Sequence, residues 1–201
     1  MSYSVRALGV TAAAALLVTA VGGAPAAADP TRSWKSINVV AVNAAGCQEQ
    51  GVKLVNLGGG LYELAMPSYQ VQTSAWPGMS KACSADITVE MNPNFSLRLD
   101  KLTARAQIRT GRQATAEATV GVVNPVGANV ELTKSWPGGV NTQWNESRSR
   151  STALIGCGAT DTFTLRTSMS AMPQQQGDTS VEITMGTAAL RPAITIKAIA
   201  C

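Results

Sequence analysis

A two-residue alternation of apolar and polar side chains recurs in short segments along this chain and constrains its fold more than any other feature. Successive side chains of a β-strand point to opposite faces, so this period indicates strands with one face buried and one face in water. The alternation is strong in five segments and weaker in five others. The strong segments are 86–91, 114–122, 162–169, 181–185 and 194–196, and the weaker ones are 37–42, 52–57, 61–66, 69–73 and 129–133.

The segments between these predicted strands are rich in glycine, proline and asparagine, residues that mark turns. No long stretch of the chain has the 3.6-residue apolar period of a helix. Short strands with frequent turns and no helix are typical of two packed antiparallel sheets. We therefore predict an all-β, jelly-roll-like antiparallel β-sandwich of about nine or ten strands.

The basic segment around residues 97–112 has two interpretations. Its cations, at three- and four-residue spacing, would form one stripe on a helix, but the apolar residues of that helix would split between two faces. As a strand, Leu97 and Leu99 point inward, and the alternation then resumes one residue out of phase at Leu102. A β-bulge near Asp100-Lys101 accounts for this shift. We predict a bulged strand whose cations form a solvated outer face; these cations are Arg98, Lys101, Arg105, Arg109 and Arg112.

A polar stretch over residues 141–152 contains one tryptophan and few other large apolar residues. Segments of this composition between periodic segments are usually exposed connections. We therefore expect a long surface loop here.

The first 28 residues have the pattern of a secretory signal peptide. Arg6 precedes an apolar run over residues 7–21, and a small-residue stretch ends in Ala26-Ala27-Ala28. A charged start, a short apolar run and an Ala-x-Ala cleavage signal mark an exported chain, and the run is too short to span a membrane. We predict cleavage after residue 28 and a single domain over residues 29–201, secreted outside the cell as a monomer.

The four cysteines, Cys47, Cys83, Cys157 and Cys201, are an even number, which in an exported chain predicts two disulfides. Four cysteines allow three pairings. We favour Cys47–Cys83 with Cys157–Cys201, because each bridge then closes a moderate loop within one half of the chain. A bridge at the last residue would also hold a terminal strand that would otherwise fray.

The chain contains no histidine. This absence excludes Ser-His-Asp and Cys-His catalysis, histidine-ligated zinc and imidazole pH switches. A hydrolase with paired carboxylates remains open, but Asp86 and Glu90 are expected about 13 Å apart on one strand, beyond the ~5–9.5 Å that such pairs use. The separation of pairs on different strands, such as Glu117 and Glu131, is not fixed by the sequence. We predict no catalytic residue, no metal and no cofactor.

The charge balance argues against two classes of partner. Lysine and arginine number 16 against 12 aspartate and glutamate, and loss of Arg6 with the signal peptide reduces the surplus from four to three. A surplus this small steers nucleic acid or an anionic membrane only weakly. We therefore expect neither as a partner.

Two identical tripeptides draw attention to the tryptophans. Trp76-Pro77-Gly78 and Trp136-Pro137-Gly138 place an indole where a strand meets a turn, and Trp144 follows shortly after the second. Tryptophans at one end of a sandwich could form a stacking platform for sugar rings or aromatic ligands. The alternative is that each indole fills the open end of the core, and the scarcity of aromatic residues favours it.

Five elements occur in an order that resembles a known family. They are Gly46-Cys47 near the mature start, Cys83 before the strand 86–91, the turn 93–95 before a basic strand ending at Gly111, Cys157-Gly158, and the final Cys201. In this order the chain resembles a family of small secreted four-cysteine, β-rich bacterial and fungal proteins classed as a domain of unknown function. The resemblance implies secretion, two disulfides and a β-rich fold, and it supplies no catalytic residues. The chain departs from the family at Lys101-Leu102, where the family tends to carry Arg-Gly.

Together these features predict a secreted, non-enzymatic β-sandwich that binds a cell-wall polysaccharide or an extracellular protein. Two alternatives are a histidine-free hydrolase with paired carboxylates, and an inhibitor of secreted hydrolases that presents a rigid loop such as 141–152. A cleft with two carboxylates would favour the hydrolase. A flat or tryptophan-tipped surface would favour the binding module.

Overall fold

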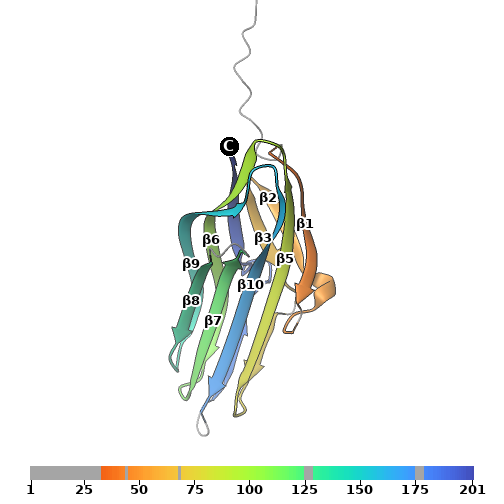
Figure 1. Ribbon diagram of the computed structural model, residues 1–201. Helices are drawn as coiled ribbons and strands as arrows, with labels where there is room; N and C mark the ends of the chain where they lie inside the picture. The colour runs from red at the N-terminus through yellow and green to blue at the C-terminus, as the bar shows by residue number, and fades with distance from the viewer. Residues whose placement is uncertain (1–32, 44, 68, 125–128, 175–178) are drawn as a thin grey trace, which may run out of the picture.

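The computed structural model describes residues 33–43, 45–67, 69–124, 129–174 and 179–201. The predicted signal peptide lies outside these ranges. Within them the chain forms twelve β-strands and one short 3-10 helix, and Figure 1 shows the strands packed as two layers. The elements are β1 (Trp34–Asn43), η2 (Glu49–Gly51), β2 (Lys53–Gly58), β3 (Leu61–Ala65), β4 (Gln70–Thr73), β5 (Met79–Met91), β6 (Phe95–Thr110), β7 (Ala114–Val123), β8 (Val130–Trp136), β9 (Asn141–Ile155), β10 (Thr160–Pro173), β11 (Val181–Thr184) and β12 (Ala193–Ala200).

The strands form two antiparallel sheets. Sheet A has the order β1-β5-β10-β7-β8, and sheet B has the order β2-β3-β12-β6-β11-β4. Strand β6 organises sheet B, because β12 and β11 pair with its two halves while β9 pairs along nearly all of its length. The predicted all-β antiparallel sandwich is confirmed, with twelve strands among the described residues rather than nine or ten.

The core lies between the sheets and is built from the inward positions of the alternation. Ile87 and Val89 on β5, and Phe163 and Leu165 on β10, are fully buried, whereas the residues between them are partly exposed. Burial of each such side chain contributes about 1.5–3 kcal/mol relative to exposure. The two-residue period therefore sets which face of each sheet turns inward.

Strand β6 contains the predicted phase shift. Leu99 pairs with Ile196 and Lys101 with Thr195, so Asp100 is the extra residue of a β-bulge. The inward positions on both sides of the bulge are buried; they are Leu97, Leu99, Leu102, Ala104, Ala106 and Ile108. The cations of β6 alternate with these residues on the outer face of sheet B, and they are Arg98, Lys101, Arg105 and Arg109.

The loop predicted over residues 141–152 is wrong, because these residues form most of β9. This strand pairs with β6 between Asn141 and Ile155. The sequence hides it because β9 lies at an edge of sheet B, where several inward positions as well as the outward ones are exposed. The inhibitor hypothesis thereby loses its loop.

Both disulfides form as predicted. Cys47–Cys83 has a Cα–Cα distance of 5.6 Å and joins the segment before η2 to β5, and Cys157–Cys201 has a distance of 6.2 Å. The second bridge holds the end of the chain against the turn between β9 and β10. The backbone N–H of Cys201 also donates to the carbonyl of Asn94 at 2.8 Å. Two disulfides indicate an oxidising environment.

The end of the sandwich opposite Cys201 is formed by four connections. They are the β4–β5 turn (74–78), the β6–β7 turn (111–113), the β8–β9 turn (137–140) and the residues that lead into β11 (179–180). We call these residues the distal end, and in Figure 1 they lie at the bottom of the molecule.

Candidate binding site at the distal end

The three tryptophans considered as binding residues have different environments. Trp136, at the end of β8, is 5% exposed, and Trp144, on β9, is 2% exposed. Their rings contact each other nearly edge to face, with centroids 5.6 Å apart. Trp76, in the β4–β5 turn, is 60% exposed. The structure therefore brings Trp136 and Trp144 together in the core, and of the three only Trp76 presents its ring to solvent.

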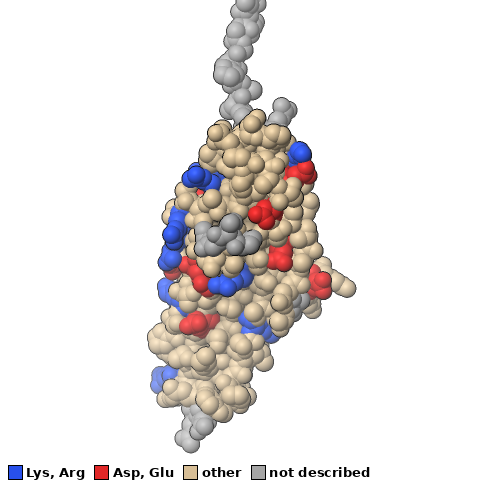
Figure 2. All heavy atoms as spheres, viewed as in Figure 1, with Lys and Arg blue, Asp and Glu red and all other residues tan. Residues whose placement is uncertain are grey.

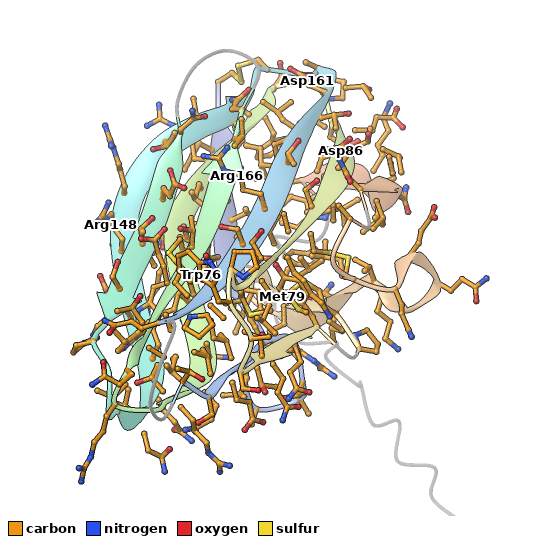
Figure 3. The ribbon with its side chains drawn as sticks, turned by 90° about the horizontal axis from the view of Figure 1, so that it is seen from below. Trp76, Met79, Asp86, Arg148, Asp161 and Arg166 are labelled. Atoms are coloured by element: carbon orange, nitrogen blue, oxygen red, sulfur yellow. A yellow bond between two sulfur atoms is a disulfide. The ribbon has the colours of Figure 1, made fainter. Side chains whose placement is uncertain are left out.

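Exposed apolar side chains gather around Trp76. Six large apolar side chains are exposed among the described residues, and three of them, Trp76, Met79 and Met172, belong to the distal end or the strand ends beside it. Gly78 lies directly against β10. A Cβ atom at Gly78 would clash with the carbonyl oxygen of Ala171, the residue before Met172. Figure 3 looks onto this end and shows Trp76 and Met79 near the middle of the view. These three side chains give the distal end an apolar tip.

A polar cleft of about 660 Å³ opens at the same end, on the side of sheet B. Its lining comes from the distal ends of β4, β6, β9 and β11 and from the turns between them. Ser74, which lies two residues before Trp76, is part of this lining. The volume lies within the range of small-ligand sites, about 300–1,000 Å³. The exposed indole and the cleft are thus neighbouring features of one end.

Four polar side chains of the cleft lie in one row across sheet B. Glu182 of β11 pairs with Gln72 of β4 on one side and with Arg109 of β6 on the other, and Arg109 pairs with Asn141 of β9. The Arg109 Nη1 atom lies 3.6 Å from Glu182 Oε2, and Gln70 Nε2 donates to Glu182 Oε1 at 3.0 Å. Amide, guanidinium and carboxylate groups supply both donors and acceptors. The row therefore suits a ligand with many hydroxyl groups.

Thr110 fixes the turns that border the cleft. It is buried, and its hydroxyl donates to the carbonyl of Pro137 at 2.9 Å and accepts from the N–H of Val140 at 3.1 Å. Gly139, whose φ of 78° favours glycine, donates to the carbonyls of Thr110 and Gly111 at 3.1 and 3.0 Å. These bonds tie the β6–β7 turn to the β8–β9 turn at the border of the cleft.

The carboxylates of the sheets have other polar partners. Asp86 accepts from the hydroxyl of Thr164 at 2.6 Å, Glu117 accepts from that of Ser135 at 2.9 Å, and Glu131 lies 3.2 Å from Arg166. Glu182 is the one acidic residue in the described lining of the cleft. A glycosidase needs two carboxylates flanking the scissile bond, and the described lining supplies one. Within the described ranges, no group of three His, Cys, Asp or Glu residues suits a metal ion.

The tyrosines with shifted pKa values belong to the core. Burial raises the pKa of Tyr69 to about 12, although a hydrogen bond with Thr167 acts in the opposite direction, and burial also raises the pKa of Tyr62. The Tyr69 hydroxyl lies 3.2 Å from the carbonyl oxygen of Lys81 and 3.1 Å from that of Thr167. Tyr69 precedes β4 of sheet B, so its hydroxyl links that sheet to β5 and β10 of sheet A.

A second hollow, of about 460 Å³, lies on sheet A and is lined by residues that include Ser84, Thr119 and Arg166. The Arg166 side chain passes over Gly121 and pairs with Glu131. We take the distal cleft as the candidate site, because it is larger than this hollow and includes Ser74 of the turn that holds Trp76.

Sequence reasoning named Trp76 as one of three candidate tryptophans, with Trp136 and Trp144, and it missed the cleft. The cleft depends on which strands are neighbours, and Gln72, Arg109 and Glu182 are far apart in the sequence. One local signal was present on β9, where Asn141, Gln143 and Asn145 alternate around Trp144. Polar residues at every second position beside an inward tryptophan are consistent with an edge strand.

The similarity of this chain to known proteins is limited to distant structural similarity. The sequence matches no family model and no curated protein. Among solved structures, TmCBM61 in complex with β-1,4-galactotriose is 10% identical with a TM-score of 0.34, covering 87% of this chain and 97% of that one. The VP2 subviral particle of infectious bursal disease virus is 13% identical with a TM-score of 0.31, covering 77% of this chain and 38% of that one. Likenesses this distant support no statement about function.

No helix among the described residues is long and apolar enough to cross a membrane.

Proposed function

We propose that this protein is a secreted, non-enzymatic binding module for a polysaccharide, which it contacts through Trp76 and the distal cleft. The observation that carries the proposal is the exposure of Trp76. Trp34, Trp136 and Trp144 are all buried, whereas Trp76 is 60% exposed. A large apolar ring held in water on a short turn is available to stack on a sugar ring.

The cleft supplies the polar half of such a site. Sugar rings have apolar faces and hydroxyl edges, so a binding site needs an aromatic surface beside fixed donors and acceptors. Gln72, Arg109 and Asn141 provide these groups within the cleft. Binding without hydrolysis is favoured because Glu182, the described acidic residue of the lining, is already engaged by Arg109 and Gln70.

A retention assay on insoluble polysaccharides tests the proposal. Oxidised protein lacking residues 1–28 is mixed with microcrystalline cellulose, chitin or purified peptidoglycan, and the bound fraction is measured against concentration. We expect retention on at least one of them. Trp76→Ala should weaken it at least tenfold, because covering about 100 Å² of indole at ~25 cal/mol/Å² is worth about 2.5 kcal/mol.

Leu57→Ala is the matched control, because Leu57 is 51% exposed on β2, away from the distal end. This variant should bind like the unchanged protein. If the unchanged protein is retained on none of the three polysaccharides, the proposal is wrong and an extracellular protein becomes the next candidate partner. Equal retention of the Trp76→Ala and Leu57→Ala variants would exclude Trp76 from the contact.

A further inference from the structure

Strands β8 and β9 form a seam along one side of the sandwich. In the described structure β8 pairs with β7 alone and β9 pairs with β6 alone, so each has one free edge. The backbone groups at a free edge remain able to bond other molecules. We call the surface between these two edges the seam, and it is defined by Lys134 on β8 and by Glu146, Arg148 and Arg150 on β9.

The seam carries charges at positions where a sandwich normally buries apolar residues. Trp144 and Thr152 on β9 pair with inward residues of β6 and are buried. Arg148 pairs with the inward residue Leu102 but is exposed, and Arg150, also exposed, lies where the pairing shifts register between Ser149 and Thr152. Lys134 has the corresponding place on β8, between the buried residues Leu132 and Trp136. Three cations therefore line the seam. The two arginines of β9 are about 7 Å apart along the strand.

None of the three cations forms an ion pair with a described acidic residue, although six ion pairs form elsewhere in the described structure. The guanidinium of Arg148 donates to the backbone carbonyl of Glu131 at 2.8 Å, and Glu146 accepts from the indole N–H of Trp144 at 3.1 Å. The positive charge of the seam is thus left available. Figure 2 shows basic residues gathered along the side where β8 and β9 lie, and Figure 3 shows Arg148 at the same side.

Charged residues on edge strands also prevent sheets from pairing with other chains. The edge strands on the opposite side of the sandwich show how many cations this protein uses for that protective role. Strand β1, the other edge of sheet A, carries one cation, Lys35, which pairs with Glu90 at 2.7 Å. At the remaining edges of sheet B, β2 carries one exposed cation, Lys53, and β4 carries none. The seam has three cations without an acidic partner, more than the edge strands of the opposite side carry. This excess points to an anionic ligand.

We propose that the seam binds a linear polysaccharide that carries carboxylate groups. Repeated cations along a strand match a polymer with repeated charges better than a single small anion. Arginine suits this role because its planar guanidinium can hold a carboxylate through two hydrogen bonds. This inference takes one premise from the proposed function, that the ligand is a polysaccharide. It does not depend on Trp76, because the seam and Trp76 are separate surfaces.

Binding to soluble polygalacturonate, measured by titration in 50 mM NaCl, tests the seam. We expect Arg148→Gln/Arg150→Gln to raise Kd roughly tenfold, since exposed ion pairs contribute modestly and two are removed. Arg148→Lys/Arg150→Lys keeps the charge and should retain most of the affinity. The matched control is Lys35→Gln/Arg166→Gln, which removes two exposed cations from sheet A and should leave Kd unchanged. Thermal unfolding of each variant confirms that it folds.

Three outcomes would overturn the inference. They are no binding of polygalacturonate by the folded protein, equal weakening by the seam variant and the sheet A control, and equally tight binding of double-stranded DNA. Failure here is separable from failure of the proposed function. Retention on neutral polysaccharide that depends on Trp76, without polygalacturonate binding, would reject the seam and keep the module.

Discussion

The two sheets share one core but present different chemistry to water. The strands of sheet A carry four cations and five acids, whereas those of sheet B carry eight cations and four acids. Sheet A pairs short hydroxyl side chains across strands, as Thr88 does with Thr162 at 2.6 Å and Thr119 with Thr133 at 3.0 Å. Sheet B instead carries long amide and guanidinium side chains that lead into the distal cleft. Figure 2 shows acidic residues spread over the face turned to the viewer.

This difference separates what the fold requires from what it leaves free. The inward positions of both sheets follow the same alternation, because a core excludes water whichever sheet supplies the side chain. The outward positions have no such constraint. A consistent bias on one face is therefore informative about partners, and the bias toward cations lies in sheet B.

The shared core should respond most strongly to truncation. Trp144 from sheet B packs on Trp136 from sheet A, with both rings buried. We expect Trp144→Ala to lower the free energy of unfolding by about 3–5 kcal/mol, because it leaves a large cavity between the sheets. Urea denaturation with the disulfides intact measures this loss. Trp76→Ala should cost less than about 0.5 kcal/mol, and similar losses for the two variants would contradict their assignment to core and surface.

The link between the sheets at Tyr69 predicts a loss of stability at high pH. Because burial raises the pKa of Tyr69 to about 12, the unfolded chain releases this proton near pH 10 while the folded protein retains it. The contribution of protonated Tyr69 to the free energy of unfolding is thus fully present below pH 10 and is lost as pH rises toward 12. Two pKa units correspond to about 3 kcal/mol. Unfolding free energies measured across this pH range test the prediction.

Tyr69→Phe provides the control for this effect. The variant loses the hydroxyl and its bonds to the carbonyls of Lys81 and Thr167, so it should be less stable at neutral pH. Its stability should then fall less steeply above pH 10, with a remaining slope due to Tyr62, whose pKa burial also raises. The same slope in both proteins would mean that Tyr69 does not control the alkaline loss.

Much of this fold follows from local sequence pattern. The bulge at Asp100 was predictable because Leu99 and Leu102 are both apolar and stand three residues apart, which a regular strand cannot bury on one face. The cysteine count predicted two disulfides and left three pairings open, and the moderate loop lengths favoured the pairing that forms, Cys47–Cys83 with Cys157–Cys201. Each of these features is determined by residues close in the sequence or by simple chain connectivity.

The candidate site was less accessible to such reasoning. Strand β9 was missed because its register becomes visible only when β6 lies beside it. The environments of Trp76 and Trp136 differ although both begin the same Trp-Pro-Gly tripeptide, since one follows a four-residue strand and the other ends a strand paired along its length. Exposure of a side chain depends on what packs over it, and that information is not local.

The smallest predicted losses of stability come from removing one carboxylate in each sheet, Glu63 in sheet B and Glu131 in sheet A. Glu63 of sheet B is nearly buried and meets two cations, Arg105 at 2.7 Å and Arg191 at 3.7 Å. Glu131 of sheet A pairs with Arg166 in an exposed contact at 3.2 Å. Glu63→Gln should lower the free energy of unfolding by about 2 kcal/mol, because it leaves two partly buried guanidinium groups without an acid. Glu131→Gln should cost less than about 1 kcal/mol.

Salt separates the two cases further. Exposed pairs are screened by ions in solution, whereas partly buried ones are screened less. Unfolding of both variants in 0.05 and 0.5 M NaCl should therefore show that the loss at Glu63 persists and the loss at Glu131 disappears. If the Glu63 loss also disappears at high salt, the Glu63 cluster behaves as a surface ion pair.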